Sequence, residues 1–259
     1  MRSRVLGTAA LAALLFAVTT GASDAVTVAS RQLVYNFTWG TQSDLSVHTS
    51  GINGGDAKIG SGASGSTGTA DFRGGVGDRG TITVELLKEQ PDKGLILKVS
   101  EQAENTRSAP AATCVVYGTT GVICDPNATL NPEEMALIRL LGSNFVDPNS
   151  IDAKRHWRIA DTTPEYSLSS DFTIAKNASG LMTIDENREV REQQPTVAVT
   201  NINTTIGYDF NRTIPITVDE YSIARSQTGM DQYQTVKTQI VLRLKSDSLE
   251  GTRRQSSSP

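Results

Sequence analysis

Apolar and polar residues alternate along much of this chain with a period of two. The clearest case is the segment 236–245, in which Val236, Ile240 and Leu242 fall on one face. This alternation is typical of antiparallel strands that bury one face of a sheet. Comparable segments begin at residue 32 and recur through 81–99 and 166–225. The sequence therefore predicts a mainly β protein, an antiparallel meander that forms a curved sheet or half-barrel in a single domain.

One segment has helical periodicity and is predicted to pack on this sheet. Asn131 suits the N-cap, Pro132 suits the first helical position, and two glutamates follow in the first turn. The predicted helix covers residues 132–141, and Gly142 suits its C-terminal end. Its apolar residues span an arc of about 220°, which is wider than packing on one sheet requires. We therefore expect either loops beside the helix or an apolar ligand.

The residues that would contact such a ligand are the apolar members of this helix and one tryptophan that follows it. The candidate ligand-binding residues are Met135, Leu137, Ile138, Leu140, Leu141 and Trp157.

The two cysteines of the chain belong to a predicted hairpin that runs from Cys114 to Cys124. A loop of odd length centred on Thr119 would place them opposite each other, within range of a disulfide, whereas a two-residue loop would offset them by one position. A redox pair usually has two intervening residues, and this pair has nine. We therefore predict a structural disulfide, as is usual in exported proteins.

The first 25 residues have the pattern of a secretory signal peptide. Arg2 and Arg4 precede an apolar run over residues 5–18, and small residues follow. The run is shorter than the roughly 20 apolar residues of a transmembrane helix. Cleavage near Ala22 or Ala25 would release a periplasmic or extracellular protein with no transmembrane segment in the mature chain.

The rest of the chain divides by composition. Residues 26–50 are the N-terminal strand region, 51–80 are a Gly/Ser-rich segment predicted to be a flexible loop, 81–249 are the main antiparallel β domain, and 250–259 are a tail predicted to be disordered. The Gly-rich segment lacks the Gly-Lys-Ser/Thr ending of a phosphate-binding loop, so a linker is the preferred interpretation.

Few residues indicate chemistry. The two histidines, His48 and His156, are distant in sequence and do not indicate a zinc site, and no Gly-x-Ser-x-Gly motif is present. We therefore predict no catalytic residues, no metal and no cofactor, and the sequence does not favour an enzyme. A formal net charge of −4 without a long basic run argues against nucleic acid as a partner.

Three functions are compatible with these features. The leading interpretation is an exported envelope or secreted protein with a structural or interaction role and a protein partner. The alternative is a protein that binds or carries an apolar small molecule, a lipid or acyl chain, at the helix. The third is a hydrolase without a recognisable motif. In the order of its elements, though in no residue motif, the chain resembles the half-barrel carriers of periplasmic lipoproteins, in which a curved sheet wraps a helix and leaves an apolar cavity.

Overall fold

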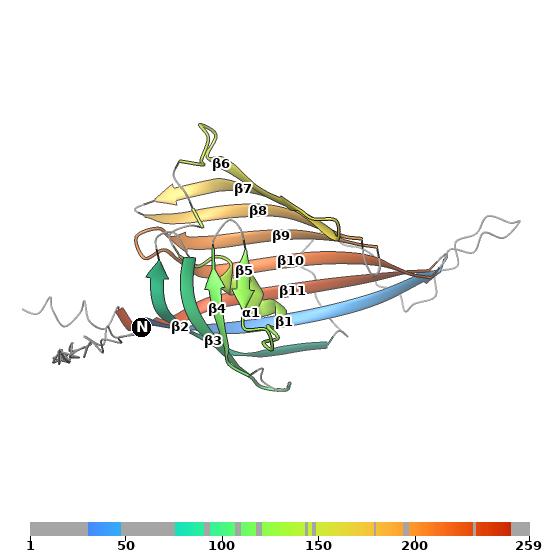
Figure 1. Cartoon of the computed structure of the whole chain (residues 1–259), viewed down its shortest axis with the longest axis horizontal. Helices are drawn as coiled ribbons and strands as arrows, with labels where there is room; N and C mark the ends of the chain where they lie inside the picture. Colours follow the sequence, from blue (N-terminus) through green and yellow to red (C-terminus); the bar gives the residue numbers. More distant parts are fainter. Residues whose placement is uncertain are drawn as a thin grey trace, which may run out of the picture.

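The computed structural model forms one antiparallel sheet of eleven strands and a single helix among the residues it describes (Figure 1). The described residues are 31–47, 76–90, 94–106, 110–117, 121–142, 145–146, 149–178, 180–193, 197–229 and 232–249. The elements are β1 (Arg31–Val47), β2 (Val76–Gln90), β3 (Gly94–Ala103), β4 (Ala112–Val116), β5 (Val122–Cys124), α1 (Pro132–Ile138), β6 (His156–Thr162), β7 (Tyr166–Ala178), β8 (Leu181–Glu192), β9 (Ala198–Asp209), β10 (Ile214–Gly229) and β11 (Gln232–Asp247).

The strand order is β5-β4-β3-β2-β1-β11-β10-β9-β8-β7-β6, so the first strand lies inside the sheet and pairs with the last. From β1 the chain meanders to the edge at β5, passes through α1 and returns from the other edge at β6. The sheet is not closed, because β5 and β6 are not paired with each other. The mainly β, antiparallel, single-domain fold predicted from the alternation, with one helix packed on the sheet, is confirmed.

The core lies on the face of the sheet that carries α1, which we call the inner face. One cross-strand row of directly paired residues runs over five strands of this face, and each of its side chains is buried. The row consists of Phe37, Leu242, Val218, Ile206 and Ile184. The apolar period of each strand therefore falls in register with that of its neighbours, which fixes the strand pairing.

Helix α1 is shorter than the predicted 132–141 segment. It ends at Ile138, with Arg139 as its C-cap. The amide groups of Leu140 and Leu141 bond to carbonyls three residues earlier, so the last turn is tighter than an α-helix. Gly142 then adopts a φ of 92°, the left-handed conformation expected at a helix exit.

The cysteine hairpin has the pairing that an odd loop requires. Cys114 and Cys124 are direct cross-strand partners and form a disulfide. The amide of Tyr117 donates to the carbonyl of Gly121, and Gly121 has a φ of 121°, which a residue with a side chain rarely adopts. The predicted structural disulfide is confirmed.

The predicted loop at residues 51–80 is wrong at its C-terminal end. β2 begins at Val76, so residues 76–80 are part of the sheet and pair with β1 through Gly80 opposite Phe37. Pairing with an interior strand outweighs the low strand propensity of a glycine-rich segment. The predicted signal peptide at 1–25, the remainder of the loop and the tail at 250–259 lie outside the described residues.

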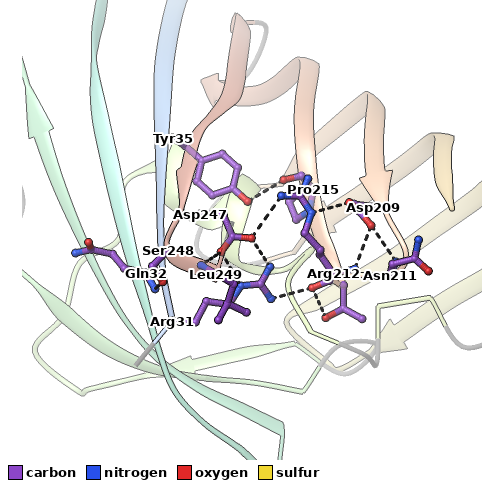
Figure 2. Close-up of polar contacts among 11 residues, drawn as sticks. Arg31, Gln32, Tyr35, Asp209, Asn211, Arg212, Pro215, Asp247, Ser248 and Leu249 are labelled. Carbon is purple, nitrogen blue, oxygen red and sulfur yellow. Dashed lines mark hydrogen bonds and ion pairs between the residues drawn. The ribbon is translucent and has the colours of Figure 1, made fainter. Parts of the chain in front are cut away.

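A polar network joins β1 and β11, the first and last strands, at one end of the sheet (Figure 2). The buried carboxylate of Asp247 accepts hydrogen bonds from Arg31 Nε and Nη2 at 3.1 and 2.7 Å. Arg212 also reaches Asp247, at 3.5 Å, and donates from Nε to Asp209 at 2.6 Å. Arg31 Nη1 donates to the carbonyl of Arg212 at 2.9 Å. Both guanidinium groups of this network contact carboxylates. We therefore assign the network a structural role: it links β1, β11 and the β9–β10 turn.

Candidate functional site

The long strands continue past α1 and leave part of the inner face without a described element over it. Figure 1 shows β8–β11 and β1 extending beyond the helix toward the right of the view. We call this part of the inner face the mouth. Two cross-strand rows form it: Thr41, Thr238, Ser222, Ile202, Arg188, Ser170 and Ile159 in the first, and Val236, Ala224, Thr200, Val190 and Leu168 in the second. Almost all these side chains are half-buried, and six of the twelve are aliphatic.

A charged row separates the mouth from the apolar core. Glu220, Thr204 and Glu186 are direct cross-strand partners on the inner face, and all three are buried. Arg139, at the end of α1, points into this row. Its Nη1 and Nη2 donate to the two carboxylate oxygens of Glu186 at 2.9 and 2.7 Å, and Nη2 also donates to Glu220 at 3.1 Å. The bidentate contact fixes the end of the helix against β8.

The charges in this row stabilise one another. Burial alone lowers the pKa of Arg139, but the carboxylates of Glu186 and Glu220 outweigh it and raise that pKa above its ordinary value. For Glu186, burial raises the pKa and the guanidinium of Arg139 more than reverses this. Arg139 and Glu186 are therefore both ionised at neutral pH.

One pocket of the mouth, which we call the arginine pocket, lies on the side of β6–β8 and has a volume of about 130 Å³. It is lined by Gly121, Arg139, Phe145, Ile159, Asp161, Tyr166, Leu168, Ser170, Phe172, Glu186 and Arg188. Burial, followed by the charge of Arg139, lowers the pKa of Arg188. Arg188 makes no hydrogen bond or close ion pair with the described part of the chain, and its Nε is buried without a partner.

A second pocket, the glutamate pocket, lies at the other side of the mouth, against β1 and β11, and has a volume of about 330 Å³. Trp39, Thr41, Thr106, Asn131, Pro132, Glu133, Thr238 and Ile240 line it. Glu133 hydrogen-bonds Glu101 through their side chains, and two carboxyl groups can share a hydrogen bond only if one is protonated. Burial, together with the charge of Glu101, raises the pKa of Glu133 to about 7.

Glu134 is the third buried carboxylate beside this pocket. One of its oxygens accepts the amide hydrogen of Asn131 at 2.9 Å, which caps α1. Burial nevertheless raises the pKa of Glu134, and the charge of Glu101 adds to this effect. The side-chain amide of Asn131 donates to Glu101 at 3.0 Å. The two glutamates predicted only to favour the helix dipole are thus held in the interior.

The residues predicted to contact a ligand lie almost entirely in the core. Leu137, Ile138, Leu140 and Leu141 are at most 1% exposed, while Met135 is 38% exposed. Helix α1 packs against β10 and β11, and Leu137, Ile138, Leu140 and Leu141 all belong to the buried apolar core. None of these residues lines either pocket of the mouth, and their ligand-binding role stays a prediction.

Trp157 is the other predicted ligand contact, and it is buried at the edge of the sheet. Its ring stacks on Phe172, its direct cross-strand partner, with centroids 4.9 Å apart, and Phe145 packs edge-on against both rings. Its Nε1 is buried and has no hydrogen-bond partner among the described residues. Trp157 therefore lies below the arginine pocket, whose wall includes Phe145 and Phe172.

Other candidate sites are less developed among the described residues. Both ring nitrogens of His156 face carboxylates, Nδ1 at 3.6 Å from Asp152 and Nε2 at 3.4 Å from Asp171, in an exposed position. His48 lies outside the described residues. No group of three or more potential metal ligands occurs in the described ranges, and no described helix is long and apolar enough to cross a membrane.

A depression of about 860 Å³ lies on the opposite face of the sheet, which we call the outer face. Its lining includes Val199, Ile223, Arg225, Tyr233 and Thr235. Its lining residues lie on β9–β11 and at Val197, whereas the pockets of the mouth lie between the sheet and residues of α1 and its flanking loops. Because inward-facing charged and aliphatic side chains meet in the mouth, we take the mouth as the candidate site.

Sequence reasoning missed the charged residues of the inner face. Each of them continues the buried period of its strand: Glu186 and Arg188 follow Ile184 at steps of two, and Glu101 follows Val99 in the same way. A charge at an inward position is the signal that could have identified them, because such positions are costly unless paired or functional.

Comparisons with known proteins do not indicate a function for this chain. No protein-family model matches the chain, and no curated protein is significantly similar to it.

Proposed function

We propose that this protein is exported and binds an apolar ligand, a lipid or acyl chain, in the mouth of its curved sheet. The observation that carries the proposal is the set of aliphatic side chains on the inner face beyond α1. Val236, Ala224, Val190 and Leu168 share one row, with only Thr200 interrupting it, and Ile202 and Ile159 lie in the adjacent row. Burying such a surface under a hydrocarbon chain is favourable by about 25 cal/mol per Å².

The dimensions of the mouth suit an extended chain. From β8 to β1 the rows cross four strand spacings of about 4.8 Å, or roughly 19 Å, a distance that an acyl chain of about sixteen carbons spans. The arginine pocket and the glutamate pocket lie toward the two ends of this path, so a chain laid across the strands would have an enclosed site at each end.

The outer face of the same strands combines polar residues with the apolar side chains of Val199, Ile223 and Tyr233. Residues 201, 203, 237 and 239 are two asparagines, a lysine and a glutamine, which alternate with the inward positions of β9 and β11. A structural role would not require an apolar inner surface beyond the helix. The structural or interaction role expected from the sequence, and the hydrolase alternative, stay untested predictions.

The test uses the full chain, exported with its N-terminal segment and purified without detergent. Native mass spectrometry would detect a bound mass that extracts into organic solvent. In parallel, the neutral dye N-phenyl-1-naphthylamine would be bound and then displaced by hexadecanol. We expect displacement at micromolar concentrations of hexadecanol. No bound lipid and no dye binding would contradict the proposal.

Neighbouring residues of β11 supply a matched pair of variants. Val236→Asp places a charge on the inner face, whereas Thr235→Asp places the same charge one residue away on the outer face. We expect Val236→Asp to weaken hexadecanol binding at least tenfold and Thr235→Asp to leave it unchanged. Ala224→Trp, which fills the same row without a charge, should also weaken binding. Equal binding by all three variants would place the ligand elsewhere.

A further inference from the structure

We propose that the ligand of the mouth carries an oxyanion head group, a carboxylate or phosphate, and that the guanidinium of Arg188 binds it. This inference rests on the proposed function and specifies the ligand: an acyl chain with an acidic end. Three observations support it. Arg188 has no hydrogen-bond partner among the described residues, the neighbouring carboxylates are already bound to other groups, and Arg188 lies beside the aliphatic residues of the mouth.

Arg188 is a cation whose hydrogen-bonding capacity is unused among the described residues. It lies on the inner face between its direct cross-strand partners Ser170 and Ile202. Its Nε is shielded from solvent without a partner, and no described side chain or carbonyl accepts from its guanidinium. Five N–H donors held in a planar fork match the two oxygens of a carboxylate or phosphate.

The carboxylates near Arg188 are already bound. Both oxygens of Glu186 accept from Arg139, and Glu220 accepts from the same guanidinium. Asp161, the other carboxylate of the arginine pocket, accepts from the hydroxyl of Tyr166. Glu186 and Glu220 raise the pKa of Arg188 only at a distance, and this effect is smaller than the effect of burial. An entering oxyanion would therefore meet a guanidinium with free donors.

The place of Arg188 sets the orientation of the ligand. It lies in the first row of the mouth, directly above the charged row, and Val190 follows it at the next inward position of β8. A head group at Arg188 leaves the chain free to run across β9, β10 and β11 toward the glutamate pocket. That pocket has buried carboxylates and no lysine or arginine in its lining, so an acidic head group would be repelled there.

The experiment compares ligands that differ only in their head group. Hexadecanoate, hexadecyl phosphate and hexadecanol would each displace N-phenyl-1-naphthylamine from the full-length mature protein at pH 8. The variants are Arg188→Gln, Arg188→Lys and the control Arg225→Gln, which removes the same charge from the outer face. Circular dichroism would establish that each variant is folded.

We expect the wild type to bind at least one of the two acidic ligands at least tenfold more tightly than hexadecanol. Arg188→Gln should lose this preference while still binding hexadecanol, Arg188→Lys should keep part of it, and Arg225→Gln should keep all of it. The stronger of the two acidic ligands identifies the head group as carboxylate or phosphate.

Two failures are distinguishable. If hexadecanol binds and the acidic ligands bind no better, or if Arg188→Gln keeps the preference, the head-group inference is wrong and the proposed function stands. If none of the three ligands displaces the dye from the wild type, the proposed function is wrong and the head-group inference falls with it.

Discussion

Replacing Glu133 with glutamine should change how the stability of the protein depends on pH. Burial and Glu101 raise the pKa of Glu133 from 4.5 to about 7 in the folded state. Between these values the folded protein holds a proton that the unfolded chain releases, so the free energy of unfolding falls as pH rises. The contribution of this group is fully present below pH 4.5 and is lost as pH rises through 7. Glutamine imitates the protonated acid and can donate to Glu101 at every pH.

The magnitude follows from the size of that interval. The values 4.5 and about 7 differ by about 2.5 pH units, and one pH unit corresponds to about 1.4 kcal/mol, which gives an upper bound of about 3.5 kcal/mol. Glu133 lines a pocket that opens to solvent, and screening there reduces the effect. We expect Glu133→Gln to be about as stable as the wild type at pH 4.5 and about 1–2 kcal/mol more stable at pH 8.

The assay is urea unfolding at half-unit steps from pH 4.5 to 8.5, followed by circular dichroism. The difference between variant and wild type cancels the contributions of other carboxyl groups. Glu192→Gln, an exposed residue at the end of β8, removes the same charge and should show no such change with pH. A difference between Glu133→Gln and the wild type that stays constant from pH 5 to 8 would refute the burial argument, as would a variant that is less stable at pH 8.

Three further predictions concern stability and share the same urea assay. Glu186→Gln leaves the buried guanidinium of Arg139 with only Glu220 as its carboxylate partner. We expect the free energy of unfolding to fall by about 2–4 kcal/mol. A fall below about 1 kcal/mol would show that the pair is not desolvated. Replacing Cys114 and Cys124 together with alanine opens a loop with a sequence separation of 10; the chain-entropy model gives a loss of about 2.5–3 kcal/mol, and reduction of the wild type with dithiothreitol should have a similar effect. Gly80→Ala would place a Cβ against the carbonyl oxygen of Gln102, so strands β2 and β3 must separate locally. We expect the free energy of unfolding to fall by more than about 2 kcal/mol. An unchanged unfolding midpoint would contradict the close approach of the two strands.

The elements that could be predicted from the sequence are those whose signal is local. The alternation at residues 236–245 identified β11. Pro132 marked the first residue of α1, and Gly142 marked the exit from the helical turn that follows it. The sequence predicted the cysteine hairpin and its disulfide but left the length of the loop open. The geometry of paired strands allows only a few ways of placing two cysteines opposite each other. By contrast, the true extent of β2 depends on pairing with β1, which is a tertiary effect.

The candidate site depends on partners that are far apart in the chain. Arg139 contacts Glu186 and Glu220, which are 47 and 81 residues away in sequence. No sequence pattern near Arg139 predicts that either glutamate is its partner. The apolar residues predicted within 132–141 left their cause open, because packing in a protein core buries such residues as well as a ligand does. Only the strand order shows that the part of the inner face with no described element over it lies beyond the helix, at Arg188 and the rows around it.

The position of β1 beside β11 has a consequence for how this protein reaches its folded state. Residue pairs such as Leu33 and Asp247 join the first and last strands in the interior of the sheet, so the contact order is high and folding is expected to be slow. Until β11 is present, the β1–β5 and β6–β10 sections have no strand pairing between them. The complete sheet therefore forms only after β11 has been synthesised.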